Sequence, residues 1–227
     1  MYTVNTKNKV MGLVRSISLF YLFTFLPLTT VAQTTTTSLT AYKEFQPATI
    51  YLMDGKHLKV GFANIFLKNS SLLYKSGQET KEANVKTLSK VVFKDRTYYR
   101  VDSVLAYQVD TIGQQHLYCA QRIDFAAWKQ QKVNNSNITN LSFGDLMSYT
   151  TINLADEQDI HFPLINVYYF QIDGKYVLAH ERNLKRVLDK EKRRLMTSVM
   201  SEPGFSWTSE ASLLKLLKYI APTLNDK

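Results

Sequence analysis

Hydrophobic and polar residues alternate in short runs between residues 47 and 102. Leu58, Val60 and Phe62 are separated by a lysine and a glycine, which gives the two-residue period of a half-buried strand. The Asp54-Gly55 pair just before them is typical of a tight hairpin turn. Several such runs, separated by turn residues, predict a small antiparallel β-barrel or sandwich-like module over 47–102, with an SH3-like barrel as the first choice.

The C-terminal part predicts a second β segment, over 103–227, that ends in two helices. Asp173-Gly174 marks another hairpin, Asp124 can cap a short helix, and Thr208 is the expected cap of the last helix. The two long helices are each recognised by a hydrophobic stripe with a period of 3.6 residues. The stripes are Leu184, Leu188, Leu195 and Val199 for the first, and Leu213, Leu216, Leu217 and Ile220 for the second. The fold class is therefore α+β, mainly antiparallel β, with the helices packed on the sheets.

The first 32 residues have the pattern of a secretory signal peptide. Positive charges precede a mostly apolar run over 17–28, and small residues close it, so cleavage is expected between Ala32 and Gln33. Met11 offers an alternative start. An extended lead-in is expected over 33–46.

An uncleaved membrane anchor is the alternative for this N-terminal run. A spanning helix needs about 20 predominantly apolar residues, whereas Pro27 interrupts this shorter run and threonines follow it. We therefore expect no transmembrane span in the mature chain. No cysteine lies near the cleavage point, which argues against a lipoprotein.

The net charge limits the classes of binding partner that are expected, and the cysteine count limits the disulfides. The formal net charge is +9, and Lys7, Lys9 and Arg15 leave with the signal, so the mature chain keeps +6. Outside the cytoplasm the abundant anions are lipid heads and glycans, so a nucleic-acid partner is not expected. Cys119 is the only cysteine, which excludes an intrachain disulfide and favours a buried thiol.

The first long helix is predicted to carry a basic face. Its candidate anion- or partner-binding residues are Arg182, Arg186, Lys190, Arg193 and Arg194. Most of these bases project opposite the leucine stripe, so they are expected to form one surface. An envelope protein, a glycan or an anionic lipid surface would suit it. The simpler interpretation, a solvated face whose charges pair with Asp189, is favoured by the helical spacing.

Glu191 differs from the other charged residues of this helix. Its projected angle falls inside the apolar stripe, between Leu188 and Leu195. A carboxylate in that position is expected to be buried in a pair, for instance with Arg194, or to line a cleft. The buried pair is the favoured interpretation.

No known catalytic or cofactor-binding motif is present. The chain contains no HExxH, GxSxG, SxxK, Walker or GxGxxG pattern, and its four histidines are scattered. We therefore predict no metal, no cofactor and no catalytic residue. The pairs Tyr98-Tyr99 and Tyr168-Tyr169 are each expected to place one ring inside the sheet and one outside.

Four segments carry a resemblance to a group of proteins. They are the signal ending in Val-Ala-Gln, Ile-Tyr-Leu-Met-Asp-Gly-Lys from residue 50, Val-Val-Phe-Lys-Asp from residue 91, and Leu-Leu-Lys-Leu-Leu-Lys from residue 213. With these segments the chain resembles uncharacterised exported proteins of Bacteroidota, which implies a location in the periplasm or envelope. In such bacteria O-glycosylation favours Asp-Ser/Thr followed by an apolar residue, so the resemblance makes Ser103 and Thr111 candidate sites.

Three functions remain open from the sequence. The favoured one is a non-catalytic exported envelope protein that binds another envelope component. An enzyme acting on cell-wall or surface glycan is the first alternative, and it predicts a cleft with two carboxylates. A lipid or anion carrier is the second, and it predicts a sizeable apolar cavity between sheet and helices.

Overall fold

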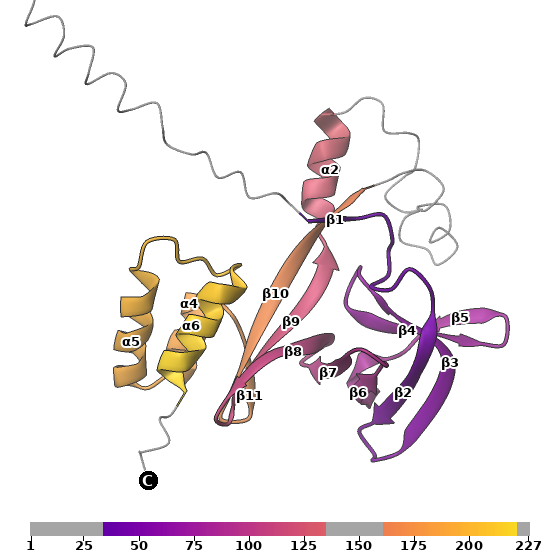
Figure 1. The fold of residues 1–227 in the computed structure, drawn as a ribbon, viewed down its shortest axis with the longest axis horizontal. Coiled ribbons are helices and arrows are strands. Elements are labelled where there is room, and N and C mark those ends of the chain that lie inside the picture. Colours follow the sequence, from indigo (N-terminus) through magenta and orange to yellow (C-terminus); the bar gives the residue numbers. More distant parts are fainter. Residues whose placement is uncertain (1–33, 135–160, 222–227) are drawn as a thin grey trace, which may run out of the picture. The chain divides into compact units, whose positions relative to one another are not determined.

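The computed structural model describes residues 34–134 and 161–221, and it confirms a mainly antiparallel β fold with C-terminal helices (Figure 1). The signal peptide predicted for 1–32 lies outside these residues. The strands are β1 (Thr35–Thr36), β2 (Gln46–Leu52), β3 (His57–Phe66), β4 (Ser71–Ser76), β5 (Glu79–Glu82), β6 (Leu88–Val92), β7 (Thr97–Val101), β8 (Val104–Ile112), β9 (Gln115–Ile123), β10 (Phe162–Ile172) and β11 (Lys175–Leu178). The helices are a 3-10 turn η3 (Val85–Thr87), α2 (Phe125–Asn134), α4 (Glu181–Val187), α5 (Lys190–Met200) and α6 (Glu210–Ile220).

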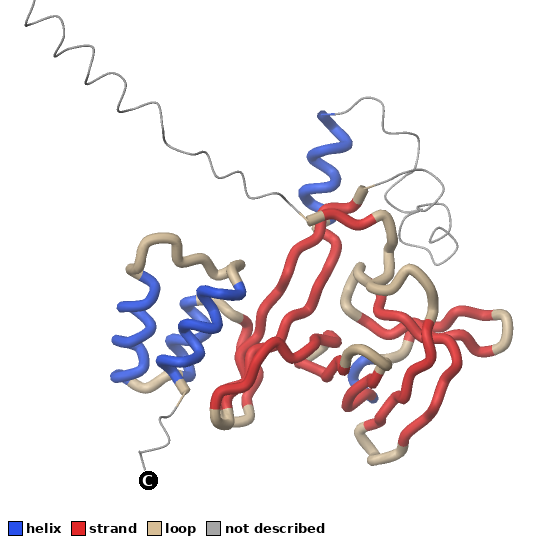
Figure 2. Tube along the Cα trace, in the orientation of Figure 1, coloured by secondary structure: helices blue, strands red, loops and turns tan. Residues whose placement is uncertain are grey.

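One antiparallel sheet connects all the described strands. Its order is β1-β10-β9-β8-β7-β6-β2-β3-β4-β5, and β11 pairs with β10 beside this path. Figure 2 shows the short turns that close the hairpins of this sheet, such as the one between β8 and β9. The boundary expected at residue 102 lies in the β7–β8 hairpin, where Tyr98 pairs with Tyr107 and Val101 with Val104. Strand pairing therefore continues across this boundary.

Strands β2 to β8 curl into a half-barrel around an apolar core. Ile50 of β2 pairs with Val91 of β6, and both are buried, so these two strands direct side chains inward at the same level. Leu58, the partner of Ile50 on β3, is 54% exposed. The buried members of this core include Ala48, Ile50, Ala63, Ile65, Leu72, Leu88, Val91, Tyr98 and Leu105. This arrangement confirms the barrel-like module.

A bulge in β3 corrects the expected strand pattern. The partners of β3 shift between Val60, which pairs with Ala48, and Ala63, which pairs with Gln46. The extra residue changes the inward positions from Val60 to Ala63. Phe62 was expected on the buried face with Val60, but it points outward and is 56% exposed.

The turn between β3 and β4 makes hydrogen bonds to both β8 and β9. Ser70 is buried and has a left-handed φ of 54°. Its carbonyl accepts from the Leu105 N–H at 2.7 Å, and its hydroxyl donates to the Gln121 carbonyl at 3.0 Å. The Leu67 carbonyl accepts from the Ile123 N–H at 2.9 Å. This turn thus supplies the partners of backbone groups on both strands.

Substitutions at Ser70 test this connection. Ser70→Gly tolerates the positive φ and loses only the hydroxyl bond, so it should cost about 1 kcal/mol of unfolding free energy. Ser70→Val adds a branched side chain that disfavours the left-handed region and should cost about 1–3 kcal/mol more. Urea unfolding of both variants measures the difference. Equal midpoints would show that this backbone geometry is not required.

Helices α4, α5 and α6 cover one face of β9 and β10. The buried residues of this second core include Leu117, Cys119, Phe170, Leu184, Leu188, Met196, Val199, Leu213, Leu216, Leu217 and Ile220. The stripe predicted for the last helix is confirmed in full. Its cap is Ser209, rather than the expected Thr208, because the Ser209 hydroxyl accepts from the Ser212 N–H.

The first long helix is not continuous, which corrects the sequence prediction. Helix α4 ends at Val187, Leu188 caps it, and Asp189 caps a new helix, α5, by accepting from the Lys192 N–H at 2.8 Å. The break changes which residues of α5 face the core. Met196 is consequently fully buried in the position expected for Leu195, which is 36% exposed.

The remaining segments also join the sheet. Leu39 is buried in the lead-in, and its carbonyl accepts from the Leu67 N–H at 2.8 Å. Asp124 caps α2 as expected, accepting from the Ala127 N–H at 2.9 Å. All described residues belong to one compact unit. Among the described helices, none combines the length and apolar character that crossing a membrane requires.

Candidate binding cleft

The two apolar cores meet at Tyr107 of β8, whose ring packs against both. A polar cleft of about 480 Å³ lies at this meeting point, and we call it the junction cleft. Asp95 and Arg96 line it from the turn between β6 and β7, and Glu210 lines it from the first turn of α6. Thr97, Tyr99, Tyr107, Gln108 and Val109 complete the lining from β7 and β8.

Arg96 is the only cation in the lining of this cleft, and its side chain is held in place. The guanidinium carbon lies 4.3 Å from the centre of the Tyr107 ring, a cation–π arrangement. Burial by itself lowers the pKa of Arg96, but the hydroxyl groups of Tyr98 and Tyr107 raise it above its ordinary value. The ion pairs found among the described residues do not include Arg96. The guanidinium also donates a hydrogen bond to the Tyr98 hydroxyl. Its charge is thus held at the cleft, and its other N–H groups can bind a ligand.

Two carboxylates stand around Arg96. One oxygen of Asp95 accepts from the Tyr42 hydroxyl at 2.8 Å, which fixes the turn against the half-barrel. Burial and this carboxylate raise the pKa of Tyr42, so the phenol stays protonated and keeps donating. Glu210 occupies the N-terminal turn of α6, where the helix dipole favours an acidic side chain. Both carboxylates leave oxygen atoms that can accept from a ligand.

A chain of polar side chains supports the cleft from the sheet. Tyr107 interacts with the Cys119 thiol, Cys119 with Tyr168, and Asn166 donates to the Tyr168 hydroxyl at 3.4 Å. The partition of the tyrosine pairs is as expected: Tyr98 and Tyr168 are buried, and Tyr99 and Tyr169 are half-buried. The rings that shape the cleft therefore rest on hydrogen-bonded partners, which limits their motion.

Cys119 is fully buried, which confirms the expected role of a packed thiol. Burial raises its pKa to about 11, so the thiol is neutral below that value in the folded chain. We expect iodoacetamide at pH 8 to label the folded mature chain much more slowly than the urea-unfolded chain, because only the thiolate reacts. Since Cys119 is the only cysteine, mass spectrometry reports it directly. Fast labelling of the folded chain would contradict the burial.

The five predicted basic residues are exposed, but they do not share one helix face. Arg182 and Arg186 belong to α4, whereas Lys190, Arg193 and Arg194 belong to α5. Arg193 donates from Nε to the Leu188 carbonyl at 2.7 Å, so it supports the break between the helices. None of the five lines the junction cleft.

Glu191 is exposed in the first turn of α5, so the favoured prediction of a buried carboxylate is wrong. It does not line the junction cleft. The cause is the break at Asp189, because the angle projected from Leu184 does not carry across it. In its actual position Glu191 lies at the positive end of the α5 dipole, where an exposed acid is favourable.

The two candidate glycosylation residues are both exposed. Ser103 lies in the turn between β7 and β8, next to Asp102, whose φ is 56°. The Thr111 hydroxyl lies 2.7 Å from Nδ1 of His116 and accepts from Gln108 at 2.9 Å. The turn position makes Ser103 the more accessible of the two.

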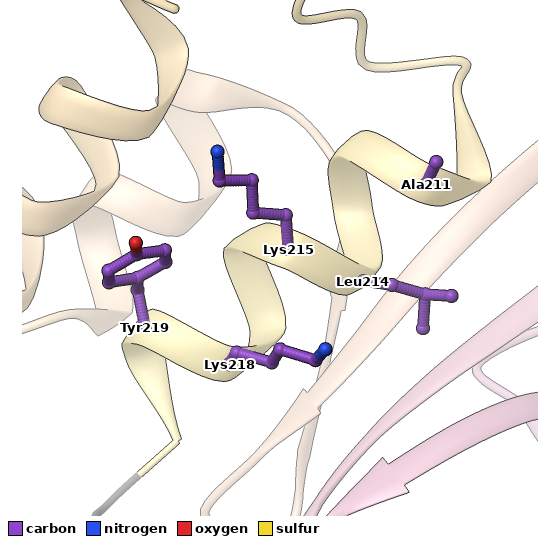
Figure 3. Close-up of a pocket in the computed structure, with 5 residues that line it drawn as sticks. All are labelled: Ala211, Leu214, Lys215, Lys218 and Tyr219. Carbon is purple, nitrogen blue, oxygen red and sulfur yellow. The ribbon is translucent and has the colours of Figure 1, made fainter.

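A second depression lies on the outer side of α6 (Figure 3). It has a volume of about 650 Å³ and is lined by Ala211, Leu214, Lys215, Lys218 and Tyr219. Lys215 is paired with Glu202. All five lining residues come from one helix, and their side chains spread in different directions in Figure 3, so they do not converge on a ligand. The junction cleft, with residues from three elements, is the better candidate.

Sequence reasoning missed the junction cleft. Asp95-Arg96 has the composition of an ordinary turn, and Glu210 that of a first-turn helix acid. The only local signal is an arginine in a turn that leads into a tyrosine-rich strand. In the described part of the chain, no three histidine, cysteine, aspartate or glutamate side chains gather in a way that could hold a metal ion. Comparison of the chain with protein-family models, with curated proteins and with solved structures gave no match.

Proposed function

We propose that this protein is a non-catalytic, exported envelope protein of a bacterium that binds another envelope component in the junction cleft. The signal pattern of the first 32 residues and the absence of a disulfide partner for Cys119 support export and a bacterial origin. The observation that carries the binding role is Arg96, which is stacked on Tyr107, pairs with no carboxylate of the described residues and faces the cleft.

Pre-orientation makes Arg96 an effective binding group. A guanidinium that is already held on an aromatic ring loses less side-chain entropy when it pairs with a ligand than a mobile arginine does. The bonds that it forms are charge-assisted and directional. An acidic group on the bound component is therefore the expected counterpart.

The substitution Arg96→Gln tests this role. Removing the charged donor should weaken retention of the purified mature chain on isolated envelope material about ten- to hundredfold. Co-sedimentation with cell-wall polymer and with envelope vesicles measures the retention. Arg182→Gln is the matched control, because Arg182 is exposed on α4 and outside the cleft; it should bind as the unmodified chain does. Equal retention of both variants would exclude the cleft as the binding site.

The basic residues of α4 and α5 provide a second version of envelope binding. Reversing Arg186, Arg193 and Arg194 to Glu would abolish an association that depends on long-range attraction to anionic lipid or glycan. Because these residues are split between two helices, the cleft is the preferred contact, and this variant should retain most of the binding.

An enzyme acting on cell-wall or surface glycan is the alternative that one observation favours. Asp95 and Glu210 both line the junction cleft, and glycoside hydrolysis uses a pair of carboxylates. Release of reducing ends from glycan that stops in both Asp95→Asn and Glu210→Gln would identify this activity. For the carrier alternative, the space between β9–β10 and the helices is filled by buried side chains, so the apolar cavity that a carrier needs lacks support there.

A further inference from the structure

We infer that the junction cleft selects a sugar residue that carries a carboxylate, such as a uronic acid within a polysaccharide. This inference rests on the proposed binding function and names the chemistry of the bound component. It follows from the charges, the hydrogen-bonding groups and the size of the cleft.

The charges of the lining favour a singly acidic ligand. One cation, Arg96, stands with two carboxylates, Asp95 and Glu210, so the lining is negative by one charge overall. A phosphate or a lipid headgroup with several negative charges would meet repulsion from both carboxylates. One carboxylate placed against Arg96 meets less repulsion than a group with several charges and suits the planar, bidentate geometry of a guanidinium.

The carboxylates also favour hydrogen-bond donors on the ligand. An ionised Asp or Glu only accepts hydrogen bonds, and Tyr42 occupies one oxygen of Asp95. Asp95 and Glu210 are both exposed at the cleft, so their remaining oxygens are accessible to a ligand. A ligand rich in hydroxyl groups supplies donors that can replace solvent there, whereas phosphate at neutral pH supplies few.

The aromatic lining and the volume complete the match. Tyr107 brings aromatic surface to an otherwise polar site, and the C–H face of a sugar ring packs on such a surface beside the Arg96 guanidinium. A volume of about 480 Å³ lies within the range of small-ligand pockets. The cleft therefore combines an acid-binding group, hydroxyl acceptors and aromatic surface in a space suited to a short glycan segment.

Titration of the purified mature chain with glucuronosyl-maltose, which is a trisaccharide with one carboxylate, with the neutral trisaccharide maltotriose and with inorganic phosphate tests the inference. Calorimetry should give at least about tenfold tighter binding for glucuronosyl-maltose than for either of the others. Arg96→Gln should remove this preference, and Arg96→Lys, which keeps the charge but not the planar fork, should restore it only in part. Arg182→Gln should leave it unchanged.

Glu210→Gln keeps the test independent of any effect of Arg96 on folding. Removing the charge of this carboxylate should narrow the preference for glucuronosyl-maltose over phosphate, because the repulsion of the doubly charged phosphate falls more than that of a single carboxylate. Tighter binding of phosphate or maltotriose by the unmodified chain would overturn the uronate assignment. The proposed function would survive that result if envelope retention still depended on Arg96, and it would fail if retention did not.

Discussion

Phe66→Ala should lower the free energy of unfolding by about 3–5 kcal/mol, the usual cost of removing a buried aromatic ring. Phe66 ends strand β3 and is 1% exposed. It packs in a third apolar cluster with Leu39, Leu67, Leu73, Ile123, Trp128 and Phe162. This cluster joins the lead-in, the β3–β4 turn and α2, so the cavity would form where several segments depend on one another.

Phe62→Ala is the matched control in the same strand. The bulge in β3 turns Phe62 outward, where its ring lies 5.7 Å from the Lys75 ammonium and is 56% exposed. Its loss should cost less than about 1 kcal/mol. Urea unfolding of the two variants measures the free energy that each substitution costs. A cost for Phe62 as large as that for Phe66 would mean that the Phe62 ring is buried, as it would be in a β3 strand without the bulge.

Met196→Ala should cost about 2–5 kcal/mol, because Met196 is fully buried between α5 and the rest of the helical core. Leu195→Ala removes a side chain of similar size from the neighbouring position, which is 36% exposed. Its cost should stay near 1 kcal/mol. Thermal unfolding of both variants, followed by circular dichroism, measures the contrast.

This pair of variants distinguishes one continuous helix from two helices separated at Asp189. A continuous helix from Leu184 would bury Leu195, whereas the break capped by Asp189 buries Met196. If Leu195→Ala were the more damaging change, α4 and α5 would have to form one helix, and Glu191 would return to the apolar side.

Local signals in the sequence were sufficient for several parts of the fold. The Asp54-Gly55 and Asp173-Gly174 pairs both form turns, and Gly55 and Gly174 have positive φ values of 86° and 76°. Asp124 caps α2, and the stripe of the last helix is buried as expected. These features depend on neighbours close in the chain, so their chemistry is visible without the tertiary structure.

The sequence predictions were wrong where we extended a regular hydrophobic period across a β-bulge or a helix break. A single extra residue in β3 moved Phe62 to the outer face. A single capping aspartate ended one helix and began another, which displaced Leu195 and Glu191 from the apolar side. The helix break is stabilised by side-chain contacts such as that of Arg193 with the Leu188 carbonyl, and a hydrophobic period carries no information about such contacts.

The sequence by itself determined the class of the fold, the hairpin turns, the last helix and the burial of Cys119, because alternation and turn chemistry are local properties. Only the tertiary structure decided the site. Arg96 and Glu210 are more than a hundred positions apart in the chain, and they line one cleft because β7, β8 and α6 meet at Tyr107. A site assembled from a turn and a helix start has no period and no motif, so it exists only once the two cores have packed together.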